Sequence, residues 1–280
     1  MDLIPLTPVE RRDGLRADCS RCVGLCCVAL AFARSADFAF SKDAGDPCVN
    51  LDENYRCVIH PDLRPMGFKG CTVFDCFGAG QKVTQHTFGG RSWREDPDSR
   101  GSMFAVFPLV RQLQELLWYL NEAAALPQTE PIRTQLDRAY AETDALTAAS
   151  ADEILALDLD AHREKVSGVL RQASKLVRSG VPLSAAARRV RPGADLMGTQ
   201  LAGQDLRGAN LRGAWLIGAD LRSTDLSYAD VIGADFRDAE LGAANLSQTL
   251  YLTQFQVNAA QGDTATVLPD FLTRPSHWRR

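Results

Sequence analysis

The sequence predicts a multidomain protein in which a short, stacked solenoid follows a three-helix α bundle and a small cysteine-rich module. Three observations predict this order. All eight cysteines lie in the first third of the 280 residues, apolar residues then recur at helical spacing, and from residue 194 an apolar side chain returns at every fifth position. We place the cysteine-rich metal-binding module at 1–102, the bundle at 103–182, a linker at 183–193, the solenoid at 194–250 and a C-terminal cap at 251–280.

Composition and charge indicate which kinds of partner and which cellular compartment to expect. The formal net charge is -4, so we expect no non-specific attraction to nucleic acid or anionic lipid. No apolar stretch has the length of a membrane span, and residues 1–15 lack the apolar core of a signal peptide. We therefore expect a cytoplasmic protein. In a reducing compartment, clustered cysteines are metal ligands or reactive thiols more often than disulfides.

The cysteines themselves predict a metal site. They are Cys19, Cys22, Cys26, Cys27, Cys48, Cys57, Cys71 and Cys76. Cys19 and Cys22 have the C-x2-C spacing that lets two thiolates reach one metal from a tight turn. The adjacent Cys26 and Cys27 point in different directions, so they serve two metals, or one is a ligand while the other packs. Four thiolates satisfy a tetrahedral zinc site or a [4Fe–4S] cluster, and eight would satisfy two.

Other residues in this segment, together with the cysteines, match the sequence pattern of a known family. They are Pro47-Cys48 with Leu51, then Cys57-Val58-Ile59-His60, Arg64-Pro65, and Cys71 with Phe74 and Cys76. Together with Cys19, Cys22 and the Cys26-Cys27 pair, they resemble the zinc- or iron-chelating CxxCxxCC proteins, and the resemblance implies that zinc or iron is bound here. In this chain three residues, 23–25, separate Cys22 from the pair where the family has two. Either Cys26 or Cys27 therefore takes the equivalent ligand position.

The middle of the chain predicts three helices. Apolar residues recur at helical spacing from Phe104 to Leu126, and again from about 132 to 148. Ser150 followed by Glu153 has the spacing of a capping box, and we expect it to begin a third helix that continues to about residue 178. Helices joined by short polar loops form an antiparallel bundle.

An apolar residue marks every repeat of the solenoid. These residues are Leu196, Leu201, Leu206, Leu211, Leu216, Leu221, Leu226, Val231, Phe236, Leu241 and Leu246. A small side chain stands two residues before nearly all of them, and glycine follows two residues after many of them. The apolar side chains point inward, while glycine tolerates the corner between repeats. Because one unit cannot bury its apolar side chain alone, the units must stack.

This pattern is similar to the A(D/N)LXX motif of the pentapeptide-repeat family. The resemblance implies a right-handed quadrilateral β-helix in which about four repeats complete one coil, so that residues twenty apart stack in columns. The repeats here give fewer than three coils. After them, Thr253 with Gln256 matches a capping box for a short helix that covers the last coil, and the closing segment resembles the tails of many bacterial proteins of this kind.

Apolar residues that face outward predict a contact surface on the solenoid. Stacking by twenty puts Met197 over Ile217, with Trp215 beside them. Exposed apolar side chains grouped on one face mark a contact surface. This surface docks on the rest of the chain or binds a protein partner.

Three functions compete. The first is a binding or adaptor protein in which a cysteine-ligated metal site stabilises the module and the solenoid presents its surface to a protein partner. We favour it because the sequence shows no catalytic constellation and therefore no catalytic residue. The second is an iron–sulfur or zinc-dependent enzyme, or a metal-handling protein, acting at the cysteines. The third, drawn from some pentapeptide-repeat proteins, is a DNA mimic that binds topoisomerases; the short, charge-balanced repeat argues against it.

Overall fold

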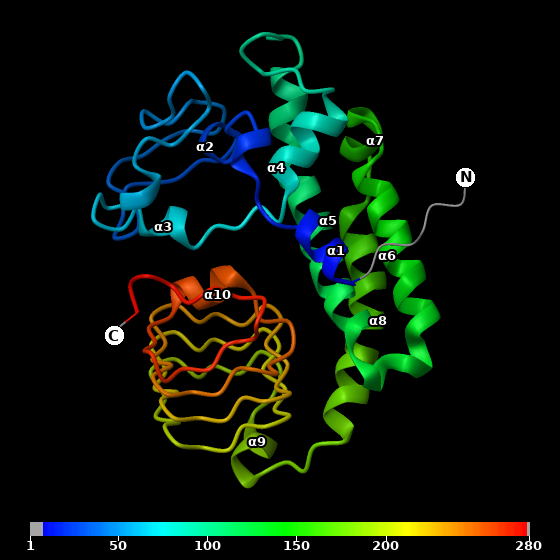
Figure 1. Ribbon diagram of the computed structural model, residues 1–280, viewed down its shortest axis with the longest axis vertical. Helices are drawn as coiled ribbons and strands as arrows, with labels where there is room; N and C mark the ends of the chain where they lie inside the picture. Colours follow the sequence, from blue (N-terminus) through cyan, green and yellow to red (C-terminus); the bar gives the residue numbers. More distant parts are fainter. Residues whose placement is uncertain (1–7, 279–280) are drawn as a thin grey trace. The chain divides into compact units, whose positions relative to one another are not determined.

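A computed structural model of the chain describes residues 8–278 and divides it into two compact units. Unit 1 ends at Leu170 and unit 2 begins at Arg171, so the boundary falls inside the long helix α8 (Leu159–Ser179). Unit 1 contains the cysteine segment and most of the helices, and unit 2 contains the repeats (Figure 1). Within the described part of the chain, no helix is long and apolar enough to cross a membrane.

Unit 1 is built around α5 (Arg100–Ala125), whose apolar side chains are fully buried along most of its length. Other helices pack on it: α1 (Pro8–Gly14), α2 (Leu25–Val28), α4 (Ala79–Lys82), α6 (Arg133–Thr147) and α7 (Ala151–Leu155). Unit 1 also contains the short helix α3 (Lys69–Thr72) and a π-helical turn at Val83–Thr87. The first two helices of the predicted bundle therefore exist, as α5 and α6, with ends shifted by a few residues.

The third predicted helix is wrong as a single element. The capping box of Ser150 and Glu153 is confirmed, but the helix that it begins, α7, ends at Leu155, and α8 starts at Leu159. Asp158 explains the restart because its carboxylate accepts a hydrogen bond from the backbone N–H of Ala161 at 3.0 Å, as an N-cap residue does. The apolar periodicity of the sequence continues through the break between α7 and α8, so it did not reveal that Asp158 begins a new helix.

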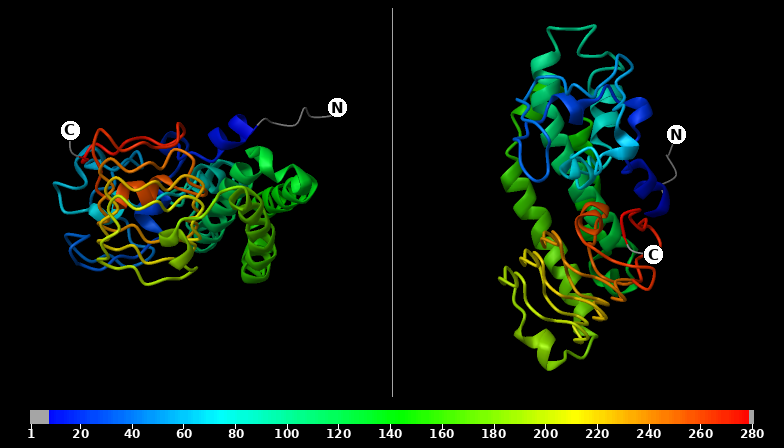
Figure 2. Two further views of the ribbon diagram at one scale, coloured as in Figure 1. Left: turned by 90° about the horizontal axis from the view of Figure 1, so that it is seen from below. Right: turned by 90° about the vertical axis from the view of Figure 1, so that its left-hand side faces the viewer.

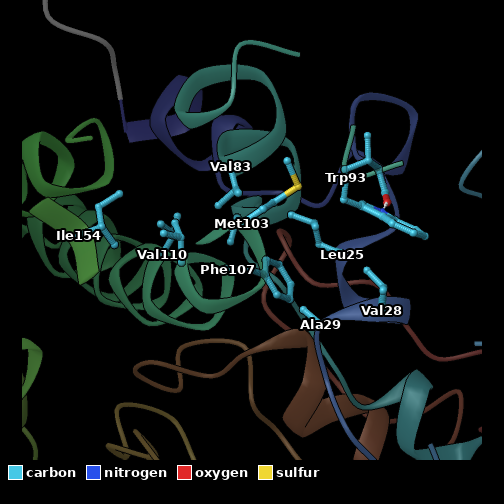
Figure 3. Close-up of a cluster of buried hydrophobic side chains, with 12 residues drawn as sticks. Leu25, Val28, Ala29, Val83, Trp93, Met103, Phe107, Val110 and Ile154 are labelled. Atoms are coloured by element: carbon cyan, nitrogen blue, oxygen red, sulfur yellow. Dashed lines mark hydrogen bonds between the residues drawn. The ribbon is translucent and has the colours of Figure 1, made fainter. Parts of the chain in front are cut away.

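A buried cluster joins the cysteine segment of unit 1 to its helices. Met103, Phe107 and Val110 of α5 meet Leu25 of α2 and Val83 (Figure 3). Trp93 closes one side, and its indole N–H donates a hydrogen bond of 2.8 Å to the carbonyl of Val23. This cluster holds the loops that carry the cysteines, which have little regular structure of their own.

Unit 2 is a coil in which residues twenty apart lie side by side (Figures 1 and 2). Single parallel bridges join the turns: Asp195 to Trp215, Gln200 to Asp220, Asp205 to Asp225, Asn210 to Asp230, Trp215 to Asp235, Asp220 to Glu240, Asp225 to Asn245 and Asp230 to Leu250. The stacking by twenty agrees with the predicted columns. No extended strand or sheet occurs among the described residues, in contrast to the β-helix expected, because each side carries one bridging residue between two corners.

The corners explain the glycines. At every fifth position the backbone φ is positive, and glycine occupies that position at 193, 198, 203, 208, 213, 218 and 233. Four other residue types adopt the same conformation at this position: Ser223, Tyr228, Asp238 and Ala243. Glycine adopts a positive φ without the steric cost that a Cβ imposes, so the predicted role of the repeat glycines is confirmed.

Short helices flank the coil. The segment 183–193, expected as a linker, contains α9 (Ala185–Arg189), whose N-cap Ser184 also donates to the carbonyl of Asp205. After the repeats, α10 (Gln254–Ala259) begins with the predicted capping box of Thr253 and Gln256. The Gln256 amide donates hydrogen bonds of 2.9 Å to the carbonyls of Val231 and Ala234. This helix thereby ties itself to the corner around Gly233 in the preceding coil.

Candidate metal centre

All eight cysteines line one cavity of about 520 Å³ in unit 1. They come from four separate stretches of the segment 19–76, so the fold gathers thiols that are up to 57 residues apart in the sequence. Most of the other lining side chains are apolar, among them Leu30, Phe32, Phe38, Leu63, Phe68 and Phe74. The cavity is therefore a largely apolar chamber whose polar groups are chiefly sulfur.

Tight turns place the first four cysteines. A 3-10 turn, Cys19–Arg21, is capped by Asp18, and the N–H of Cys22 donates to the carbonyl of Cys19. Gly24 then takes a positive φ of 71°, which starts α2 and brings Cys26 and Cys27 to the cavity. Glycine is required at such a reversal because a Cβ there is strained.

Backbone pairing places Cys48 and Cys57 beside Cys27. The N–H of Cys48 donates to the carbonyl of Cys27 at 2.9 Å. Leu51 forms an antiparallel bridge with Cys57, and its N–H donates to the carbonyl of Cys48. The three cysteines therefore sit on adjacent, hydrogen-bonded pieces of chain.

The last two cysteines come from the end of the segment. Cys71 lies in α3, and Cys76 lies just before α4, where the N–H of Ala79 donates to its carbonyl at 2.8 Å. Gly80 of α4 meets Cys22 so closely that a Cβ at residue 80 would lie 2.7 Å from the Cys22 sulfur. Gly80 thus creates the space in which the Cys22 thiol lies.

The eight thiols are free in this structure, and burial raises the pKa of most of them. Desolvation raises the pKa of Cys22 to about 11 and that of Cys71 to about 12. Cys26 and Cys27, with sulfurs 3.9 Å apart, form a pair. The hydrogen bond between them, together with burial, raises the pKa of Cys26. The same bond, with a smaller contribution from Lys42, lowers the pKa of Cys27. Binding of a metal by buried thiols would release their protons.

The spacing of the donor groups discriminates between kinds of metal site. Across residues 8–278, no three side chains of His, Cys, Asp or Glu are close enough together to hold a single metal ion. His60 lines the cavity, but it completes no such group. A preformed mononuclear zinc site is therefore absent from the described residues. The predicted binding of zinc or iron by these cysteines stays a prediction.

A buried lysine was not foreseen from the sequence. Lys42 is 7% exposed, and its ammonium group donates to the carbonyls of Val28, Asp43 and Asp46 at 3.2, 2.8 and 2.8 Å. It influences Cys27 and Cys48 electrostatically. The lysine fixes the loop after α2 and brings a positive charge toward the thiols. A single lysine in a loop carries no sequence signal for such a role.

The predicted partner surface lies in unit 2. Met197 is 47% exposed and Trp215 is 53% exposed. Ile217 is half-buried, and its carbonyl accepts a hydrogen bond from the N–H of Gly198, which places it next to the corner that follows Met197. The fold thus brings the three side chains to one region, and their role in binding a partner stays a prediction.

Comparisons with known proteins identify the repeats and one long relative. The family described as pentapeptide repeats matches eight copies, within residues 194–227, 205–242 and 216–250. Alr5209, a pentapeptide repeat protein from Nostoc Pcc 7120 with a crystal structure, is 36% identical over 29% of this chain and 71% of its own, with a TM-score of 0.20. The uncharacterized protein YybG of Bacillus subtilis (strain 168) is 52% identical over 265 residues, 95% of each chain. The chain therefore belongs to the family of YybG and carries pentapeptide repeats in its C-terminal part.

Proposed function

We propose that this protein is a pentapeptide-repeat binding protein that holds a cysteine-ligated iron–sulfur centre in unit 1. The observation that carries the proposal is the convergence of all eight cysteines on one cavity of about 520 Å³. Free cysteines that serve only as small apolar side chains have no reason to converge in this way. Four thiolates are the usual ligand set of an iron–sulfur cluster.

The spacing of the thiols favours a cluster over a single zinc ion. Tetrahedral zinc holds each sulfur at about 2.3 Å, which brings its ligand sulfurs within about 4 Å of one another. The Cys26 and Cys27 sulfurs are 3.9 Å apart, and no three donor side chains among the described residues are placed to hold a single metal ion. A cluster has several metal atoms and spans thiols that lie farther apart, which fits sulfurs distributed around a cavity.

The surroundings of the thiols suit such a centre. When bound, an iron–sulfur cluster supplies electron transfer. The lining is mostly apolar, and Lys42 contributes a positive charge that offsets the charge of ligating thiolates. The cysteines would release protons as they become ligands.

Metal and sulfide analysis tests the proposal. The full chain is purified without oxygen, and iron, zinc and acid-labile sulfide are measured per chain, with the absorption near about 400 nm that clusters give. We expect iron and sulfide in equal amounts, lost in Cys71→Ser and retained in the neighbouring control Thr72→Ser. Tightly held zinc without sulfide would overturn the iron–sulfur assignment.

For unit 2 the proposal is that the repeats form the right-handed quadrilateral β-helix of their family and present Met197, Trp215 and Ile217 to a protein partner. The exposure of Met197 and Trp215 supports it, because side chains of this size are usually covered. Trp215→Ser should abolish capture of the partner by the tagged full chain. Val267→Ser is the matched control, since Val267 is 49% exposed in the same unit. Equal capture by both variants would contradict the proposal.

A further inference from the structure

We infer that the protein partner of unit 2 binds through an extended segment of its chain, which adds to the open edge of the first coil along residues 195–202. The inference rests on the proposed partner surface of Met197, Trp215 and Ile217, and it names the kind of partner that this surface takes. The segment carries apolar side chains and a lysine or arginine.

The bridging residues of each coil direct both of their backbone groups toward the preceding coil. The N–H of Asp220 donates to the carbonyl of Thr199 at 2.9 Å, and the carbonyl of Asp220 accepts the N–H of Leu201 at 2.8 Å. Three other residues of unit 2 repeat this pattern: Trp215, Asp225 and Asp230. Within the described part of the chain no coil precedes the first one, so its bridging residues direct the same groups outward.

The segment around α9 covers one half of this outer edge. α9 lies at the end of unit 2 where the first coil begins, and α10 lies at the other end (Figure 1). The hydroxyl of Ser184, the N-cap residue of α9, donates to the carbonyl of Asp205. Leu206 and Leu211, the inward-pointing residues on this half, are fully buried.

The other half of the edge is open. Asp195 and Gln200 are exposed, and among the described residues nothing is hydrogen bonded to the backbone N–H or carbonyl of either. Leu196 and Leu201, which follow them, are only half-buried, whereas the inward-pointing residues of the later coils are buried. Because a row of unpaired N–H and carbonyl groups is a template for pairing with another extended chain, this edge offers both hydrogen bonds and apolar contacts.

The last coil shows how an extended segment takes such a place. Gln261, which lies outside the repeats, forms a parallel bridge with Glu240, and Val267 forms one with Asn245. The N–H and the carbonyl of Gln261 are both hydrogen bonded to the last coil. The tail therefore occupies positions that a further coil would have. On the open half of the first coil no described segment does so, which favours an extended segment of another chain as the occupant.

Asp195 gives the charge of that segment. Three aspartates at the equivalent position, Asp205, Asp220 and Asp235, each pair with an arginine two residues later. After Asp195 this place is taken by Met197, and Asp195 forms no ion pair with another described residue. Complementary charges give binding its specificity. A segment with a basic residue near Asp195 and apolar side chains near Met197 matches both features.

Selection from a peptide library tests the inference. The full chain is exposed to random peptides displayed on phage, and the enriched peptides are synthesised for binding measurements. We expect peptides with apolar side chains and a lysine or arginine. They should bind Gln200→Pro about tenfold more weakly, because proline removes the N–H at the edge. Asp195→Asn should also weaken their binding. It keeps the turn, since Asn210 and Asn245 accept from the residue two positions later as Asp195 does. A library that yields no such peptide would overturn the inference.

Hydrogen exchange of the wild-type chain tests the same edge without depending on the folding of a variant. A selected peptide should slow the exchange of amides in residues 195–203 and leave α10 unchanged, and unchanged exchange at 195–203 would overturn the inference. Equal peptide binding by Gln200→Pro and wild type, with a loss in Trp215→Ser, would overturn the edge pairing and leave the proposed partner surface standing. A wild-type dimer that Gln200→Pro converts to a monomer would show that a second copy takes the edge, and it too would overturn the inference.

Discussion

The carboxylate of Asp230 is completely buried and lies 2.9 Å from the guanidinium of Arg212, which stands on the preceding turn of the coil. The other carboxylate oxygen accepts the N–H of Ile232 at 3.1 Å. Arg212 itself is 16% exposed, so both charges are largely removed from water. The pair therefore ties one turn of unit 2 to the next through a salt bridge that is largely removed from water.

Removing Arg212 should destabilise unit 2 strongly. Arg212→Ala leaves the buried carboxylate of Asp230 without its partner, and breaking a buried pair in this way costs about 3–5 kcal/mol in the free energy of unfolding. Arg237→Ala is the matched control, because Arg237 pairs with Asp235 but is 59% exposed, and such pairs contribute about 0–1 kcal/mol. Urea unfolding measures the free energy of unfolding of both variants. Equal losses would show that burial of the Arg212 pair contributes nothing.

The corners of the coil give a second prediction: a substitution at one corner should lower the stability of unit 2, and a substitution at another should raise it. Gly218 has φ of 62° and open space where a Cβ would go, so Gly218→Ala should cost only the backbone strain of about 1–2 kcal/mol. Ala243 has φ of 55° at the equivalent corner, so Ala243→Gly should relieve strain and stabilise the unit by up to about 1 kcal/mol. Thermal unfolding of the two variants checks the signs. A loss of stability in both would contradict the argument.

Gly208 provides a stricter version of the same test. Its φ is also positive, at 66°, but a Cβ there would lie 3.1 Å from the side chains of Val181 and Leu183. Gly208→Ala should therefore cost more than Gly218→Ala, because steric crowding adds to the backbone strain. If the two variants are equally stable, the segment before α9 does not pack on this corner in solution.

Periodic features of this fold could be predicted from the sequence, whereas features that depend on a single side chain could not. The five-residue period predicted the stacking by twenty and the role of the corner glycines, because every repeat carries the same signal. The break before α8 depends on one side chain, Asp158, inside an otherwise periodic stretch, and the pattern concealed it.

The cysteine cavity, too, could be predicted from the sequence only in part. Spacing in the sequence indicated a metal site, and the structure brings all eight thiols to one cavity. The spacing could not show which cysteines lie next to each other, since Cys27 meets Cys48 through a backbone hydrogen bond and Cys57 is placed by a bridge with Leu51. Such pairings between irregular loops depend on tertiary packing. Lys42 and Gly80 were missed for the same reason.

Acid should weaken unit 2 through its aspartate–arginine pairs. Hydrogen bonds from Arg222 lower the pKa of Asp220 to about 2, and similar bonds from Arg207 lower that of Asp205. An unfolded aspartate has a pKa of about 3.9. A carboxyl group whose pKa is lower in the folded state contributes stability that is present above about pH 4 and is lost as the pH falls toward 2.

The pH dependence of unfolding tests this directly. In Asp220→Asn the contribution of that carboxylate is absent, so the fall in unfolding temperature between about pH 4 and pH 2 should be shallower than in the wild type. The neighbouring pairs still titrate, and the slope should therefore decrease without reaching zero. Parallel curves for the two proteins would mean that the pKa of Asp220 is the same in the folded and unfolded states.

The contact between Gly80 and Cys22 predicts a selective loss of metal. A Cβ at residue 80 would lie 2.7 Å from the Cys22 sulfur and 3.4 Å from its Cβ, so Gly80→Ala must displace that thiol. If Cys22 is a ligand of the proposed iron–sulfur centre, the variant should bind less iron and sulfide than the wild-type chain.

Gly101→Ala is the matched control for this variant, because Gly101 is also a helical glycine of unit 1 but has nothing within 4 Å of the position of a Cβ. Alanine favours a helix more than glycine does, so neither change should break its helix, and circular dichroism checks that both proteins are folded. Iron content then distinguishes the cases. Full iron in Gly80→Ala would contradict a ligand role for Cys22, and an equal loss in Gly101→Ala would show that the loss does not come from the contact with Cys22.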